Sequence, residues 1–124
     1  MNTEQRFNIL FRKPSYPVIV ISGQELLIAN NIKQLAKCCI KAEQEVEQDL
    51  KIIKAFDTTG TEFWYSIGNY AISPGFAAKK WSKKKIIELY NQAENSTETY
   101  SEESLSSKKL DVIIKEISEL INKS

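Results

Sequence analysis

The sequence contains no histidine, and this absence excludes more chemistry than any other feature of its composition. Histidine is the usual proton carrier near neutral pH and the commonest protein ligand of zinc. Catalytic triads, dyads and most metal sites therefore lose their usual member. Glycine is also scarce, with four residues in 124, and no phosphate-binding or dinucleotide-binding glycine motif is present. We therefore expect no catalytic residues, no cofactor and no metal site, and hence a protein that is not an enzyme.

Cysteine is limited to two adjacent residues, Cys38 and Cys39, in a stretch that has the pattern of a helix. Successive helical side chains diverge by about 100 degrees, so the two thiols are badly placed to bind one metal ion or to form a disulfide with each other. We interpret them as small buried or half-buried side chains rather than as redox or nucleophilic groups. Nothing in this usage indicates an oxidising compartment.

Long hydrophobic runs are absent as well. A run such as residues 18–21 is far too short to cross a bilayer. The N-terminal sequence MNTEQRFNILFRKP carries an acid before its first arginine and only a short semi-apolar run, which is unlike a signal peptide. These patterns predict a cytoplasmic protein that does not associate with membranes.

Neither sign of charge is in large excess, because the sequence contains 17 lysines and arginines and 16 aspartates and glutamates. At a net charge of +1, no global field draws the protein toward nucleic acid or an anionic membrane. Any such attraction must come from a local cluster. The hydrophobic fraction of 42% and the charged fraction of 27% are ordinary for a globular domain, and the chain is long enough to fold without a metal or a disulfide.

The patterns that are present predict an antiparallel sheet of about five strands. Residues 6–12 alternate like a half-buried strand, and residues 17–29 resemble a hairpin whose first strand is apolar on both faces. Residues 51–67 form the clearest hairpin of the chain. Residues 70–72 follow a further turn signal and extend this hairpin to a three-stranded meander.

Three segments have the apolar period of amphipathic helices. The first covers residues 31–48, with Asn30 or Asn31 as the N-cap. The second follows the N-cap Ser82 and covers residues 83–91, and the third closes the chain. We expect an α+β domain in which the first, long helix packs on one face of the sheet and the other two helices complete that layer.

The chain divides by composition into three parts. Residues 1–92 form the α+β core domain. Residues 93–104 contain four glutamates and no lysine or arginine, which is typical of an acidic polar linker. Residues 105–124 form the C-terminal amphipathic helix, which packs either on the core or on a partner, so that a homodimer through this helix is left open.

One charged cluster is not explained by local structure. Five of the seven residues from 79 to 85 are lysines: Lys79, Lys80, Lys83, Lys84 and Lys85. The last three lie in the first turn of the predicted helix, where each cation costs about 0.3 to 1 kcal/mol against the helix dipole. A helix start of this kind attracts an anion, although a solvated lysine run is the simpler interpretation. Trp64 joins the candidate site because it points away from the aromatic face of its strand.

These observations favour a small non-enzymatic protein–protein interaction module in the cytoplasm, such as an adaptor, an antitoxin or an immunity-like protein with an unidentified protein partner. The alternative is a nucleic-acid-binding module that uses the basic cluster at residues 79–85 together with nearby aromatic rings. A third hypothesis is an internal switch, in which the acidic linker lies over the lysine cluster.

Overall fold

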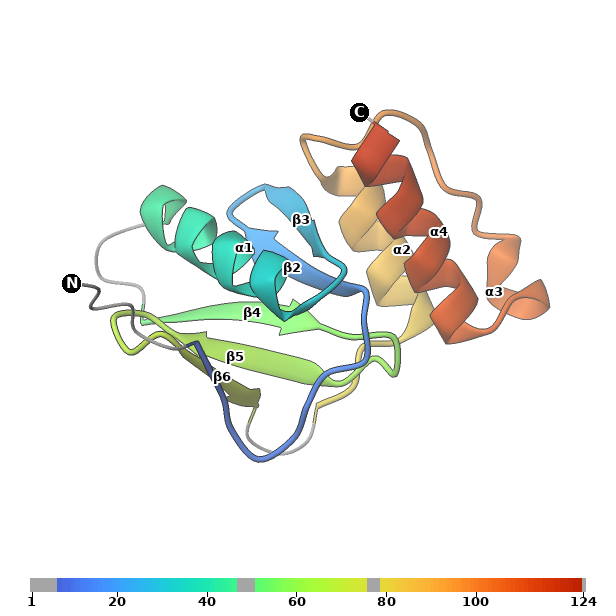
Figure 1. Ribbon diagram of the computed structural model, residues 1–124. Coiled ribbons are helices and arrows are strands. Elements are labelled where there is room, and N and C mark those ends of the chain that lie inside the picture. Colours follow the sequence, from blue (N-terminus) through green and yellow to red (C-terminus); the bar gives the residue numbers. More distant parts are fainter. Residues whose placement is uncertain (1–6, 47–50, 76–78, 124) are drawn as a thin grey trace.

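The computed structural model describes residues 7–46, 51–75 and 79–123, which form one six-stranded sheet and four helices (Figure 1). The strands are β1 (Asn8–Ile9), β2 (Val18–Ser22), β3 (Glu25–Ala29), β4 (Ile52–Phe56), β5 (Glu62–Ser66) and β6 (Ala71–Pro74). The helices are α1 (Ile32–Glu45), α2 (Lys83–Gln92), α3 (Ser104–Ser107) and α4 (Leu110–Lys123). The α+β class that the sequence predicts is confirmed.

The sheet is mixed rather than wholly antiparallel. In the described part of the chain its strand order is β1-β6-β5-β4-β2-β3, and β1 runs parallel to β6, with Asn8 beside Ala71. The sheet has six strands where a total of about five was expected, and its first strand is much shorter than residues 6–12. A neighbour so distant along the chain leaves no trace in local periodicity, so the parallel pairing could not be predicted.

Both predicted hairpins are present. In the β2–β3 hairpin, Val18 lies opposite Ala29 at the open end and Ser22 lies opposite Glu25 at the two-residue turn. In the β4–β5 hairpin, Ile52 lies opposite Ser66 and Phe56 lies opposite Glu62. β6 pairs with β5 and completes the meander. The alternation along β5 is also as expected, because Phe63 and Tyr65 are buried together while Trp64 lies on the opposite face.

Successive residues of β2 face two different apolar cores. Val18 and Val20 belong to the core beneath α1, whereas Ile19 belongs to the core beneath α2 and α4. The helices therefore cover both faces of the sheet rather than completing one layer, and Figure 1 shows α1 apart from the α2–α4 pair. The physical reason is the apolar character of β2 on both faces, since each face has to be removed from water.

The C-terminal helix α4 packs on its own chain. Its apolar stripe is buried in the second core together with Ile19 and Leu26 of the sheet. The buried residues of this stripe are Ile113, Ile114, Ile117 and Ile121.

The helix starts follow the expected capping chemistry. Asn31 Oδ1 accepts a hydrogen bond of 2.9 Å from the backbone N–H of Gln34 at the start of α1. Ser82 Oγ accepts one of 3.2 Å from the backbone N–H of Lys85 at the start of α2. α1 ends at Glu45, and the last two residues predicted for it, 47 and 48, lie outside the described residues.

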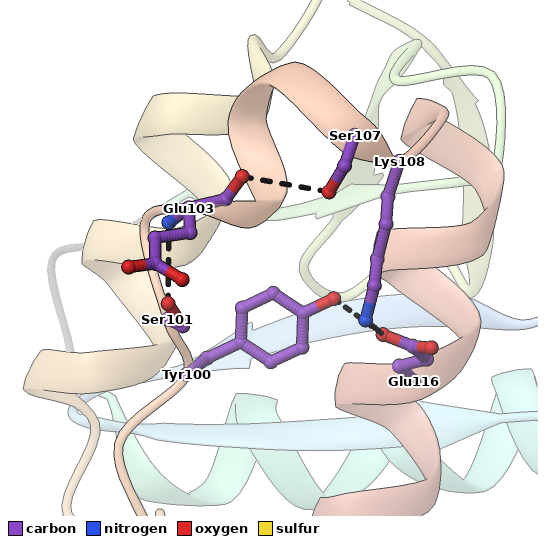
Figure 2. Close-up of polar contacts among 6 residues, drawn as sticks. All are labelled: Tyr100, Ser101, Glu103, Ser107, Lys108 and Glu116. Atoms are coloured by element: carbon purple, nitrogen blue, oxygen red, sulfur yellow. Dashed lines mark hydrogen bonds and ion pairs between the residues drawn. The ribbon is translucent and has the colours of Figure 1, made fainter.

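The segment between α2 and α4 is held at several points. The side-chain amide of Asn95 donates to the carbonyl of Leu26 at 2.8 Å and accepts from the N–H of Leu26 at 3.0 Å. Asn95 thus pairs with the edge of β3 as a residue of a neighbouring strand would. Figure 2 shows that the Tyr100 hydroxyl and the Lys108 ammonium converge on Oε1 of Glu116, at 2.5 and 2.7 Å. These contacts join the segment to β3 and to α4.

No helix in the described part of the chain is both long enough and apolar enough to span a membrane.

Candidate functional site

Residues 79–81 are attached to the beginning of β5 by a short backbone ladder. The N–H of Glu62 donates to the carbonyl of Lys79 at 3.0 Å, and the N–H of Trp81 donates to the carbonyl of Gly60 at 2.7 Å. Thr61 and Lys80 face each other between these bonds as an isolated antiparallel bridge. Because of this ladder, two lysines and a tryptophan that precede α2 lie beside the first residue of β5.

Glu62 is a buried carboxylate held by two indoles. Only 4% of this residue is exposed. Its Oε2 accepts a hydrogen bond of 2.7 Å from Trp64 Nε1, and its Oε1 accepts one of 3.1 Å from Trp81 Nε1. A buried charge is tolerated only where hydrogen-bond donors replace its hydration, and here both oxygens have such a donor. The two tryptophans therefore fix the position of one negative charge.

The two indoles are themselves held tightly. The ring of Trp81 stacks on Phe56 at 4.8 Å between centroids. The ring of Trp64 lies against the backbone of Gly75, where an added Cβ atom would come within 2.6 Å of the indole nitrogen. No real Cβ atom sits that close to another heavy atom, so glycine at this position lets the indole reach Glu62.

Four lysines surround a cleft above this carboxylate. The cleft has a volume of about 250 Å³. We call it the lysine-lined cleft, and its lining residues are Lys54, Glu62, Lys79, Lys80, Trp81 and Lys85. In residues 7–46, 51–75 and 79–123 the ion pairs are Lys108–Glu116 and Lys115–Asp111, so none of the four lysines of the cleft is paired with a described acid within 4.0 Å. The cleft is thus an electropositive cavity with a carboxylate at its floor.

The structure separates the five lysines of the predicted cluster. Lys79, Lys80 and Lys85 line the cleft. Lys83 instead donates from Nζ to the carbonyl of Leu105 at 3.2 Å, and Lys84 is exposed without lining the cleft. The helical period explains this division, because consecutive residues of the first turn of α2 point in different directions.

Three residues of the cleft were missing from the sequence-based site. These are Trp81, which lies within the lysine run, and Lys54 and Glu62, which lie on β4 and β5 and so are distant from that run in sequence. A signal for Lys54 existed, since the hairpin register places it directly opposite Trp64 on the same face of the sheet. Trp64 itself is half-buried and acts through its bond to Glu62 rather than as part of the lining.

The acidic segment forms no ion pair with the lysines of the cleft in the described residues. This holds for Glu94, Glu98, Glu102 and Glu103 at a limit of 4.0 Å. The internal-switch hypothesis gains no contact that would support it.

A second buried carboxylate, Asp57, has a structural role in the β4–β5 turn. Its Oδ1 accepts from the N–H and the hydroxyl of Thr59, at 2.9 and 2.6 Å. Its Oδ2 accepts from the N–H of Ser15 at 2.9 Å. Asp57 therefore ties this turn to the segment that precedes β2, and both of its carboxylate oxygens accept hydrogen bonds there.

The two cysteines are poor nucleophiles where they lie. Burial raises the pKa of the Cys38 thiol, and the nearby ammonium of Lys41 only partly opposes this effect. Burial raises the pKa of Cys39 further, with additional contributions from Cys38 and Glu43. Both groups remain thiols at neutral pH, and thiolate is the reactive form. No group of three potential metal-ligating side chains occurs among the residues that the structure describes.

No protein-family model matches this sequence, and comparisons with curated proteins and with solved structures yield no match either.

Proposed function

We propose that this chain is a non-enzymatic, cytoplasmic protein–protein interaction module of the adaptor, antitoxin or immunity-like kind, and that it binds an acidic protein partner through the lysine-lined cleft. The observation that carries this proposal is the convergence of Lys54, Lys79, Lys80 and Lys85 on one cavity without a described acid within 4.0 Å. Unpaired cations brought together by long-range structure favour binding of an anionic group.

The shape and charge of the site support a protein partner more than a nucleic acid. A nucleic acid presents phosphates at regular intervals and is bound by a basic stripe or face. Here four cations gather at one cavity of about 250 Å³, on a protein whose net charge is only +1. A cavity of this size matches one or two acidic side chains of a partner surface. Complementary charges at such a surface mainly accelerate association and select the partner.

The state of the acidic and thiol groups supports a role without turnover. Both oxygens of Glu62 are already hydrogen-bonded to indoles, and Asp57 is similarly occupied. The thiol pKa values of Cys38 and Cys39 are raised by burial. Unpaired thiols at both positions also suit a reducing compartment such as the cytoplasm. Catalytic turnover that disappears on substitution of a carboxylate or a cysteine would contradict this part of the proposal.

The test is affinity isolation of the partner from the native host with three baits. The first is the wild-type protein, and the second carries Lys79→Gln, Lys80→Gln and Lys85→Gln. The third is a matched control with the same change of charge on the exposed face of α1, at Lys33, Lys37 and Lys41. The partner should be recovered with the wild-type and control baits and lost with the cleft variant, and the purified pair should show slower association at high salt. Equal recovery by all three baits would reject the cleft as the binding surface.

Nucleic acid is the second candidate, because the ring of Trp81 lines the cleft beside the lysines and single-strand binders combine stacking with cations. Fluorescence anisotropy with labelled single-stranded and double-stranded DNA and RNA tests it. Four lysines that contact phosphates of a duplex predict a slope of log K against log salt of about −3.6, since each phosphate contributes about −0.9. Absence of binding at about 20 mM salt removes this candidate, because phosphate contacts are strongest there.

A further inference from the structure

The loop after β1 displays an aromatic side chain to solvent on an unfavourable backbone conformation. Phe11 is 94% exposed and has a φ of 69 degrees. The N–H of Arg12 donates to the carbonyl of Leu10 at 2.8 Å, so Phe11 is the central residue of a γ-turn with positive φ. Such turns are rare and strained for a residue with a side chain. Figure 1 shows this connection as the blue loop at the lower edge of the molecule.

Comparison with Tyr70 shows what is unusual about Phe11. Tyr70 is the other described residue besides glycine with a positive φ, at 50 degrees. Its ring packs edge-on against Phe7 at 5.1 Å between centroids, so packing within the domain accompanies its strained backbone. Phe11 also has a positive φ, but its side chain is almost fully exposed and gains no such packing. A strained, exposed side chain is a candidate for contact with another molecule.

Both ends of the loop are fixed to the sheet. The N–H of Leu10 donates to the carbonyl of Ile72 at 2.9 Å, which continues the pairing of β1 with β6. At the other end the N–H of Ser15 donates to Asp57 Oδ2 at 2.9 Å, and the hydroxyl of Thr58 donates to Ser15 Oγ at 2.6 Å. Pro14 between these anchors is buried. These anchors restrict the conformations of the loop before any partner arrives, and such restriction reduces the entropy lost on binding.

We propose that Phe11 is an anchor residue that inserts into an apolar pocket on a protein partner, and that the rim of this pocket carries carboxylates that meet Arg12 and Lys13. Both cations are exposed and follow Phe11 directly. An aromatic ring flanked by cations is the composition of binding hot spots, in which a ring fills a pocket and charged groups surround it. Leu10, which is 45% exposed, adds apolar area next to the ring.

A membrane surface fits these residues less well. Binding to a bilayer interface requires a broad apolar face, usually the whole side of an amphipathic helix. This loop offers one complete aromatic ring and part of one leucine. A preformed protein pocket can bury such a ring on all sides. Insertion into a lipid interface does not require the ring to be held on a strained turn.

This surface is separate from the lysine-lined cleft, because none of its residues lines that cavity. The inference goes beyond the proposed function and does not depend on it. The variants that test the two surfaces are different, so either can fail while the other stands.

The experiment begins with site-specific photo-crosslinking in the native host, with p-benzoylphenylalanine at position 11 and, as the control, at Ile32, an apolar residue of α1 that is 49% exposed. The crosslinked site on the partner is mapped by mass spectrometry. The partner is then purified, and its affinity is measured for wild type, Phe11→Asn and Ile32→Asn. Asn is enriched several-fold among residues with a side chain at positive φ, so Phe11→Asn removes the ring with little added strain on the turn. Cosedimentation with vesicles of phosphatidylcholine and phosphatidylglycerol at a ratio of about 7 to 3, anionic as a cytoplasmic leaflet is, runs alongside.

The proposal expects a crosslink that is specific to position 11 and that maps to apolar residues with aspartate or glutamate around them. It also expects Phe11→Asn to weaken the affinity on the order of tenfold or more, while Ile32→Asn leaves the affinity unchanged. Equal affinity of Phe11→Asn and wild type overturns it, as does the lack of a crosslink above the Ile32 control. Binding to vesicles that disappears in Phe11→Asn also overturns it, in favour of a membrane contact.

Discussion

The indole of Trp81 and the carboxylate of Glu62, nineteen residues apart, are joined by a hydrogen bond of 3.1 Å at the floor of the lysine-lined cleft. Together with the bond of 2.7 Å from Trp64, this contact satisfies the buried charge without a lysine. Because neutral donors hold the carboxylate, the ammonium groups above it are not drawn into ion pairs with it within 4.0 Å in the described residues. The indoles thereby leave the ammonium groups without a described acid within 4.0 Å.

The first prediction concerns this carboxylate. Glu62→Gln replaces one acceptor oxygen by an amide group that faces an indole N–H, so one buried donor loses its partner. Unfolding in urea should show a loss of about 1 to 3 kcal/mol, and the tryptophan emission of the folded protein should change. Glu88→Gln, on the exposed side of α2, is the control and should change neither. Equal stability of the two variants would mean that the hydrogen bonds from the two indoles to Glu62 make no net contribution to the free energy of unfolding.

The second prediction uses the same chemical change at two tyrosines. The Tyr90 hydroxyl is buried and has no hydrogen-bond partner among the described residues, so Tyr90→Phe removes an unsatisfied group and should raise the free energy of unfolding by about 1 kcal/mol. The Tyr100 hydroxyl donates to Glu116, so Tyr100→Phe should lower that free energy by about 1 to 2 kcal/mol. Thermal unfolding of both variants checks the opposite signs, and a loss of stability in both would refute the assignment at Tyr90.

The third prediction concerns the pH dependence of the Tyr100–Lys108–Glu116 cluster (Figure 2). The hydrogen bond from Lys108, followed by the one from Tyr100, lowers the pKa of Glu116. A lowered pKa in the folded state contributes stability above the pKa of the unfolded chain, and this contribution is lost as the pH falls through the folded value. The difference in stability between wild type and Glu116→Gln should therefore be constant near neutral pH and shrink below about pH 4, close to the ordinary range of glutamate.

The same cluster predicts a second change on the alkaline side. The pKa of Lys108 is raised, first by its hydrogen bond to Glu116. The pKa of Tyr100 is also raised, first by burial. A raised folded pKa contributes stability that is fully present below the unfolded value and is lost as the pH rises through the folded one. The stabilisation should thus begin to fall at about pH 10 to 10.5, the ordinary range of tyrosine and lysine, and be lost as the pH rises through the raised folded values. Urea titrations at several pH values test both limits, and a difference that is independent of pH at both ends would contradict the cluster.

The fourth prediction separates strain from packing at Phe11. Phe11→Gly relieves a positive φ that glycine adopts freely, and it removes little packing from a side chain that is 94% exposed. The relief exceeds the extra backbone entropy of glycine, so the free energy of unfolding should rise by about 0.5 to 1 kcal/mol. Phe11→Ala removes the same ring but keeps the strain, so it should give no such gain. Equal melting temperatures of the two variants would show that the turn is not strained.

Much of the architecture follows from short-range patterns. The turn glycines and the alternation of strand residues predict both hairpins, and Asn31 and Ser82 mark the starts of their helices. These signals act between residues a few positions apart, where backbone geometry alone decides which side chains meet. The apolar character of β2 on both faces also indicated a covered strand, but not which helix covers which face.

The candidate site could be predicted only in part from such short-range patterns. A run of lysines was visible, yet Lys83 and Lys84 do not line the cleft, whereas Lys54 of β4 does. The role of Trp64 depends on Glu62 and on the bare backbone of Gly75, which no local pattern relates to each other. Side chains from four segments meet here because of the ladder between residues 60–62 and 79–81.

The sequence by itself determined the α+β class, the hairpins, the helix caps and the face on which Trp64 lies, because periodicity and capping are interactions within one or two turns of chain. Only the tertiary structure decided the parallel pairing of β1 with β6, the placement of helices on both faces of the sheet and the convergence of four lysines above Glu62. These arrangements depend on contacts between distant segments, and such contacts are chosen by the burial of the whole chain rather than by any stretch of it.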